Sequence, residues 1–312
     1  MTEYNRNDIP PLRRLLRIKE RDTYVFGNNS IKVSITAADY GYIGWVTVTV
    51  FRLAEERAQS AAKVFLLPRG RLDLSPSPDK GDIVFRSKNA SLDAIKSPGK
   101  RIIRCKWTAF DDVRPLYINV TLEDTECEGL WTETPFLGAK GVPRSGLFSF
   151  GQKYIGMKVS GNMQYGAEEI EFLPEESTGA YRFDRGVLPF EACREWCWAA
   201  AEGCSFTFGG WGERQAGENL VILDGVRYTP PKTQIRYDTH SDEWRIRTPD
   251  DSIDLTFKPL FERRYGRRLS YLAAYDIHQD IGIYSGVIHM AGGAERVLDG
   301  VLGFAEEIFE RL

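Results

Sequence analysis

The chain has 312 residues, 42% of them hydrophobic and 27% charged, a composition typical of globular proteins with one large β domain or two smaller ones. A formal net charge of −3 leaves no basic surplus to neutralise phosphates, which argues against nucleic acid as a partner. The first residues contain no apolar core of signal-peptide length, and no stretch approaches the roughly 20 apolar residues of a membrane span. With an odd count of five cysteines, these features predict a cytoplasmic protein whose thiols are reduced.

Most segments alternate apolar and polar residues with a period of two, which is the pattern of half-buried β-strands. A short segment at 11–18 favours a helix instead. The strand pattern then recurs in residues 30–39, 44–53, 116–124, 154–161, 252–260 and 282–290. Residues 303–312 place Phe304, Ile308 and Leu312 on one helical face and predict a C-terminal helix.

The strand candidates number roughly twice the eight that close one small barrel, which favours two lobes over one. A stretch rich in Gly, Pro and Ser at 134–152 marks the join between the lobes. We therefore predict an all-β fold of two antiparallel β-barrel lobes with a short C-terminal helix. The first lobe is expected in residues 1–140 and the second in residues 141–312.

Several segments, in chain order, resemble the bacterial domain-of-unknown-function 2804 family. They include "YNRNDI" (4–9), "KGDIVFRSKNASL" (80–92), "FLPEESTGAYRFDRGVLPF" (172–190), "GENLVILDGVRY" (217–228) and "VLGFAEEIFE" (301–310). By looser resemblance the family is similar to two-lobed lipocalin-like (calycin) proteins, which include carotenoid hydratases, tocopherol cyclases and fungal cyclases. This kinship implies lipocalin-like lobes and an apolar small-molecule ligand held at or between them.

One segment departs from the family pattern. Relatives commonly carry a motif like Asp-Trp-Gly-Arg-Gly where this chain has Arg182, Phe183, Asp184, Arg185 and Gly186. Arg185 and Gly186 match the motif, whereas the acid has moved two positions, which keeps it on the same strand face. We expect an ion-paired group of Arg182, Asp184 and Arg185 to keep this site polar.

Charged and aromatic residues alternate closely throughout residues 182–198 and favour a ligand pocket. We expect an aromatic cavity with a charged group that orients the ligand, formed by Phe183, Asp184, Arg185, Trp196 and Trp198. Aromatic walls also stabilise the cationic centres that a cyclase or hydratase generates. The alternative is that the tryptophans fill a barrel core and the arginine pairs with a carboxylate for structure.

Among the three histidines, His278 is the candidate general acid or base, because Asp276 lies two residues before it on the same strand face. The alternative is a structural histidine at a strand end. Neither the histidines nor Cys193, Cys197 and Cys204 have the spacing of a zinc site, so we predict no metal. The chain has no dinucleotide fingerprint and no nucleophile elbow, so we predict no cofactor.

Two glycine-rich turns, at 37–45 and 209–219, carry further candidate ligand-binding residues. The side chains expected to face the ligand are Asp39, Tyr42, Trp45, Trp211, Glu218 and Asn219. Each turn also has a plainer interpretation. Asp39 would accept backbone N–H groups at a barrel corner, and the second turn would be a hairpin loop without chemistry.

These features favour an enzyme that acts on an apolar small molecule by cyclisation, isomerisation or hydration, without a metal or redox cofactor. Asp184, Arg185 and His278 would supply polarisation and proton transfer in a water-poor site. One alternative is a non-catalytic binder or carrier of a lipid-like or polyprenyl ligand. The other is an interaction protein with filled barrels.

Overall fold

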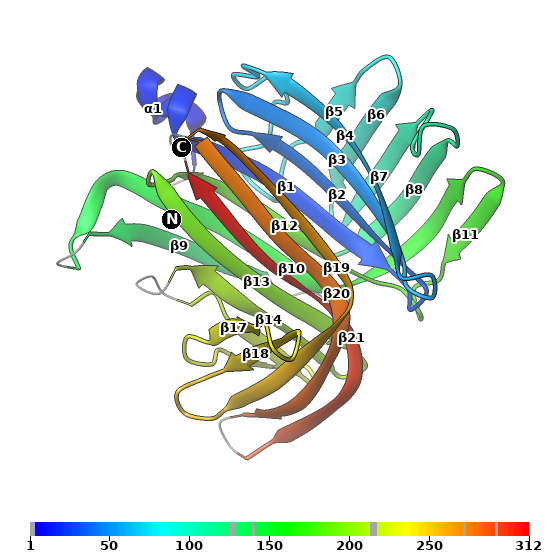
Figure 1. Cartoon of the computed structure of the whole chain (residues 1–312), viewed down its shortest axis with the longest axis vertical. Coiled ribbons are helices and arrows are strands. Elements are labelled where there is room, and N and C mark those ends of the chain that lie inside the picture. Colours follow the sequence, from blue (N-terminus) through cyan, green and yellow to red (C-terminus); the bar gives the residue numbers. More distant parts are fainter. Residues whose placement is uncertain are drawn as a thin grey trace. The chain divides into compact units, whose positions relative to one another are not determined.

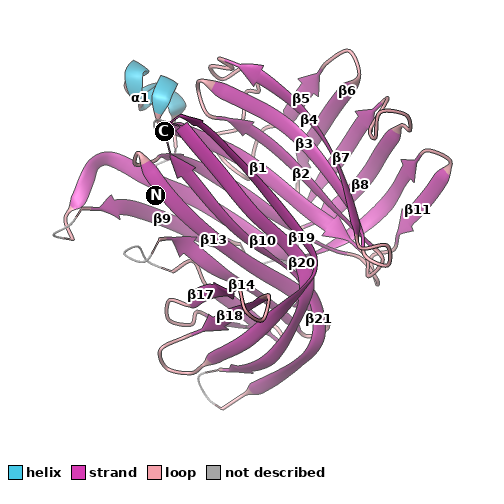
Figure 2. Cartoon of the chain, in the orientation of Figure 1, coloured by secondary structure: helices cyan, strands magenta, loops and turns pink. Residues whose placement is uncertain are grey.

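A computed structural model describes residues 4–124, 129–138, 141–212, 217–270, 273–290 and 293–311. The chain divides into two compact units: unit 1 comprises residues 1–133 and 146–188, and unit 2 comprises residues 134–145 and 189–312. Each unit is built on a curled antiparallel sheet, a half-barrel, as Figures 1 and 2 show. The predicted all-β architecture with two lobes is confirmed.

Helix is confined to the N-terminal part of the described chain, in a 3₁₀ turn at Arg6–Asp8 and in α1 at Pro11–Leu16 (Figure 2). The N-terminal helix prediction is therefore confirmed. No helix of the described ranges is long and apolar enough to cross a membrane.

The predicted C-terminal helix is wrong, because residues 303–311 belong to a long strand, β21 (Glu295–Arg311). Phe304 and Ile308 do share one face there, since residues four apart lie on the same side of a strand as well as of a helix. The spacing alone could not separate the two structures. Pairing with a neighbouring strand on each side makes this segment β.

The sheet of unit 1, which also includes residues 134–137 and 143–145 of unit 2, runs in the order β4-β3-β2-β1-β12-β10-β8-β7-β6-β5, with β9 and β11 each paired to β10. Its strands are β1 (Ile18–Gly27), β2 (Ile31–Asp39), β3 (Ile43–Arg52), β4 (Arg57–Leu66), β5 (Ile83–Arg86), β6 (Ala90–Ser97), β7 (Lys100–Trp107), β8 (Leu116–Glu123), β9 (Leu130–Leu137), β10 (Pro143–Tyr165), β11 (Glu168–Phe172) and β12 (Thr178–Val187). Alternate residues, among them Tyr24, Ile35 and Phe183, form one core cluster on what we call the inner face of unit 1.

The sheet of unit 2 runs in the order β16-β15-β14-β13-β21-β20-β19-β18-β17 (Figure 1). Its remaining strands are β13 (Glu191–Ala201), β14 (Cys204–Trp211), β15 (Leu220–Leu223), β16 (Val226–Tyr228), β17 (Gln234–Asp238), β18 (Glu243–Arg247), β19 (Ile253–Ser270) and β20 (Ala273–His289). The core of its inner face includes Cys197, Phe206, Trp244 and Tyr284.

Lys32 is buried in unit 1, and no carboxylate of the described residues pairs with its ammonium. Lys32 is the second residue of β2 and the cross-strand partner of Gly27 in β1. Its side chain is 7% exposed and donates to the Gly27 carbonyl at 3.2 Å. Removal from water disfavours the charged form and lowers the pKa of Lys32 to about 8.

Replacing Lys32 with Met should raise the free energy of unfolding near neutral pH by about 3 kcal/mol. This is the free energy that corresponds to the lowering of the Lys32 pKa from 10.5 to about 8. In the wild type the folded state loses this proton at a lower pH than the unfolded state, so wild-type stability rises between pH 8 and 10.5. The advantage of Lys32→Met should therefore shrink across that range. Urea unfolding at both ends of the range measures it, with the exposed Lys88→Met as control, and a constant advantage would refute the explanation.

Candidate functional site

Arg185, on the inner face of unit 1, has all five of its N–H groups occupied by protein acceptors. Nε and Nη2 donate to the Ser75 carbonyl at 3.0 and 2.8 Å. Nη1 donates to the carbonyls of Arg21 and Asp184 at 3.1 and 2.8 Å. Nη2 also donates to the Asp22 carboxylate at 2.7 Å, and the Arg185 side chain is fully buried. No donor is left for a ligand.

The surroundings of Asp22 complete this network. The Tyr181 hydroxyl donates to the other carboxylate oxygen of Asp22, and the Tyr181 ring stacks on Tyr24 with centroids 4.8 Å apart. The Arg101 guanidinium lies 3.7 Å from the centroid of the Tyr181 ring. Burial raises the pKa of both tyrosines, which keeps their hydroxyls protonated. The interior around Arg185 is therefore aromatic and charged, and it is filled by side chains that the sequence did not indicate, Asp22, Tyr24, Arg101 and Tyr181.

Asp184 and Arg182 point to the opposite face from Arg185, because successive strand residues alternate. The expected pair is present, with Arg182 Nε 3.0 Å from the Asp184 carboxylate, and Arg21 lies 3.4 Å from it. Phe183 faces inward and packs edge-on against Phe150 at 6.0 Å. The three-residue ion group expected at 182–185 is therefore split between two faces of the sheet.

Trp196 and Trp198, on β13, lie side by side with ring centroids 6.4 Å apart. Both are buried on the face opposite Cys197, which belongs to the unit 2 core. Trp196 donates to the Thr207 hydroxyl at 3.0 Å. Trp211 packs against Phe136, with the Arg194 guanidinium 5.0 Å from its ring.

The residues expected at the two turns take part in turn contacts. Asp39 accepts the backbone N–H of Gly41 at 2.9 Å and of Gly70 at 2.6 Å. Asn219 accepts from the Gly209 N–H at 3.2 Å and donates to the Pro231 carbonyl at 2.6 Å. Three other expected residues lie near these turns: Tyr42 accepts from Lys19 at 3.1 Å, Trp45 packs on Tyr40 at 4.6 Å, and the buried Glu218 bonds through its backbone to Gly209.

His278 lies beside two carboxylates on the inner face of unit 2. Its Nε2 is 2.8 Å from Oε1 of Glu262 and 3.0 Å from Oδ2 of Asp280. The antiparallel register of β19 and β20 brings them together, because Glu262 is the cross-strand partner of Asp280. The sequence indicated Asp276, two residues before His278, whereas the carboxylate beside Nε2 is Asp280, two residues after it.

Asp280 is completely buried in this cluster. Its Oδ2 accepts the indole N–H of Trp244 at 2.6 Å. Its Oδ1 has no hydrogen-bond partner within the described residues, and neither has Nε2 of His278, which lies 3.0 Å from Oδ2. A buried carboxylate that is only partly satisfied costs free energy and is typical of functional sites.

Aromatic rings border the imidazole and leave one side more open. The centroids of Tyr237 and Trp244 lie 4.7 and 4.9 Å from that of His278. Side-chain exposure falls from 39% at Glu262 to 11% at His278 and 0% at Asp280, which gives the cluster an open and a closed end. Arg264 donates to Glu262 at the open end.

The same three side chains are the described group that could hold a metal ion, since one ligand atom from each lies within 4.8 Å of the others. An imidazole with two carboxylates suits divalent transition metals. The sequence pattern could not show this set, because its members come from two strands, β19 and β20. Their pairing register shifts between Pro259 and Phe261, which places Glu262 opposite Asp280.

Replacing Arg185 with Gln should lower the free energy of unfolding by about 3–5 kcal/mol, because Asp22 would remain as a buried charge without its cation. Adding Asp22→Asn should recover part of that loss, since the two sites are directly coupled. Urea unfolding followed by tryptophan fluorescence measures both variants. A loss below about 1 kcal/mol for the single variant would contradict a structural role.

Three solved structures are similar to the chain in fold. A Nitrosomonas europaea protein provisionally named AttH has 14% identity and a TM-score of 0.55, covering 98% of this chain and 94% of that one. Kievitone hydratase from Nectria haematococca has 9% identity and a TM-score of 0.50, with coverages of 97% and 92%. CghA with Sch210972 has 9% identity and a TM-score of 0.51, with coverages of 95% and 89%.

A comparison with curated proteins finds none that matches the chain. One family model, described as Domain of unknown function (DUF2804), matches residues 1–312 and confirms the resemblance found in the sequence. The chain therefore belongs to the DUF2804 family.

Proposed function

We propose that unit 2 carries an acid–base active site in which His278 and Asp280 add water to, isomerise or cyclise an apolar small molecule that contains a carbon–carbon double bond. The observation that carries this proposal is the buried, partly satisfied carboxylate of Asp280, 3.0 Å from the His278 imidazole. Histidine gains and loses a proton near neutral pH, and an adjacent carboxylate orients it for that task.

In the proposed reaction, Asp280 or His278 donates a proton to one carbon of the double bond. The π electrons form the new C–H bond and leave a cationic centre on the other carbon. In a hydration, water then forms the C–O bond and returns a proton to the imidazole or the carboxylate. In a cyclisation, the π electrons of a second double bond form a C–C bond to the cation, and the new cationic centre then loses a neighbouring C–H proton to the imidazole or the carboxylate, which forms a double bond. In an isomerisation, the first cation loses a neighbouring C–H proton to the same base.

The walls of the site suit such a cation. Tyr237 and Trp244 offer aromatic faces, and carboxylates at Glu262 and Asp280 add negative charge close to them. Aromatic faces and carboxylates both favour a passing positive charge, more strongly where water is excluded. The open end at Glu262 would admit the substrate, and the closed end at Asp280 would hold the reacting carbons.

The comparisons support the reaction class only through the fold. One similar structure is named as a hydratase, and another contains CghA with Sch210972. We assign Arg185 a structural role, because every N–H group it has is occupied, and place Asp184 with it in the scaffold.

Asp280→Asn and His278→Gln should each lower turnover by about 10²–10⁴-fold, the usual contribution of a general acid or base. Purified protein would be incubated with a panel of terpenoid and polyphenol alkenes in heavy-oxygen water or in deuterium oxide. Mass spectrometry then detects heavy oxygen added by hydration, or deuterium gained by isomerisation. His289→Gln is the matched control, because His289 also faces a carboxylate, Glu295, but is 50% exposed.

Stability distinguishes a catalytic loss from a folding defect. The free energy of unfolding of Asp280→Asn should lie within about 1 kcal/mol of the wild-type value or above it, because catalytic charges are commonly kept at a cost in stability. Turnover that survives both substitutions would refute the proposal. Tight ligand binding without any isotope incorporation by the wild type would favour the carrier alternative.

A further inference from the structure

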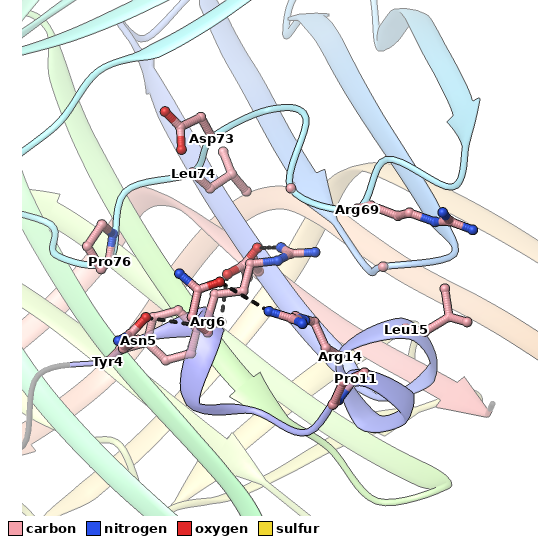
Figure 3. A pocket seen from close by; sticks show the side chains of 14 residues that line it. Tyr4, Asn5, Arg6, Pro11, Arg14, Leu15, Arg69, Asp73, Leu74 and Pro76 are labelled. Atoms are coloured by element: carbon pink, nitrogen blue, oxygen red, sulfur yellow. Dashed lines mark hydrogen bonds and ion pairs between the residues drawn. The ribbon is translucent and has the colours of Figure 1, made fainter.

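Unit 1 contains a separate pocket of ≈ 600 Å³ close to the N-terminus, which Figure 3 shows. Its walls come from residues 4–7, from α1, from the turn at Gly41 and from the loop at 69–76, and Glu20 of β1 lies in its floor. The volume lies in the range of small-molecule sites.

The acceptors in and beneath the floor already have donors. Tyr4 donates its hydroxyl to one oxygen of Glu20 at 2.6 Å, and Arg6 donates to the other. Arg6 also donates to Asp39 at 3.2 Å, and the backbone N–H groups of Gly41 and Gly70 occupy both oxygens of Asp39. A ligand therefore meets carboxylates whose hydrogen-bonding capacity is largely used.

The hydrogen-bonding groups of the pocket that remain for a ligand are mainly donors, and two arginines carry them. Among the described residues the Arg14 side chain makes one hydrogen bond, to the neutral amide oxygen of Asn7 at 3.1 Å, which leaves most of its guanidinium N–H groups for a ligand. Arg69 makes no hydrogen bond or ion pair with any described residue. The one carboxylate left at the rim is Asp73, which is exposed and also unpaired within the described chain.

The loop that carries Arg69 has a strained backbone next to the pocket. Leu67, Arg69 and Asp73 have φ of 51°, 50° and 47°, a left-handed region that side chains other than glycine adopt at a cost. Such conformations persist where surrounding contacts enforce them and are frequent at ligand sites. Here Asp39 fixes the loop through the Gly70 N–H.

We propose that this pocket binds a small organic anion, with its acidic group on Arg14 and Arg69 and its apolar part on Leu15, Leu74 and Pro76. Guanidinium groups bind carboxylate, sulfonate and phosphate oxygens through paired N–H donors. The apolar side chains line the same pocket and give the body of the ligand an apolar surface (Figure 3). This site is distinct from the His278 cluster and does not depend on the function proposed there.

Two dyes with the same rings test the charge requirement: 1-anilinonaphthalene-8-sulfonate carries a sulfonate, and N-phenyl-1-naphthylamine lacks it. Fluorescence titration should give tighter binding of the sulfonate dye to the wild type. Arg14→Gln and Arg69→Gln should each weaken that binding by about tenfold to a hundredfold, as expected for one hydrogen bond to a charged group. Binding of the neutral dye should change by less than about twofold.

Arg236→Gln, an exposed arginine of unit 2, is the matched control and should leave both dyes unaffected. Hydrogen–deuterium exchange locates the site, and the sulfonate dye should protect residues 11–16 and 67–76. Arg69→Lys, which keeps the charge, should retain part of the affinity.

Any of four results would overturn the proposal. Three concern binding: no binding of the sulfonate dye, equal binding of both dyes, or unchanged binding to the Arg14→Gln, Arg69→Gln double variant. The fourth is protection that maps only outside residues 11–16 and 67–76. Asp280→Asn should leave dye binding unaltered, so the two proposals fail separately. Near-UV circular dichroism confirms that each variant is folded.

Discussion

A carboxylate enclosed by a β-sheet must be neutralised by what surrounds it, and the two units meet this constraint in different ways. In unit 1, the Asp22 carboxylate accepts one hydrogen bond from the charged guanidinium of Arg185 and another from the Tyr181 hydroxyl. In unit 2, Asp280 accepts one indole N–H and lies 3.0 Å from the imidazole Nε2 of His278. The first carboxylate is fully compensated and belongs to the scaffold. The second has an oxygen, Oδ1, without a hydrogen-bond partner in the described chain, and for this reason we propose Asp280, and not Asp22, as the functional carboxylate.

Strand alternation explains why these charges lie where they do, and how far the sequence could predict them. The period of two predicted the all-β fold and singled out His278. It could not choose between Asp276 and Asp280, which are equally spaced from His278. Glu262 depends on a register shift in β19 that no local pattern encodes. The prediction of a C-terminal helix was wrong for a similar reason, since residues spaced four apart share a face both in a helix and in a strand.

Membership of the DUF2804 family and the similar solved structures establish the family and the fold. Unit 1 uses Arg101, Arg185 and Asp22 to hold its aromatic interior together, whereas Arg14 and Arg69 line the pocket near the N-terminus without an ion pair among the described residues. Unit 2 combines imidazole, carboxylates and aromatic rings in one cluster. Proton transfer therefore fits unit 2, and recognition of an acidic group fits unit 1.

The most direct measurement is a crystal structure of the protein with the molecule it turns over, or with an unreactive analogue. The reacting carbon should lie about 3–3.5 Å from a carboxylate oxygen of Asp280 or from Nε2 of His278, the distance of a productive approach. A ligand that leaves both side chains untouched, with the reacting carbons elsewhere in the chain, would contradict the proposed function.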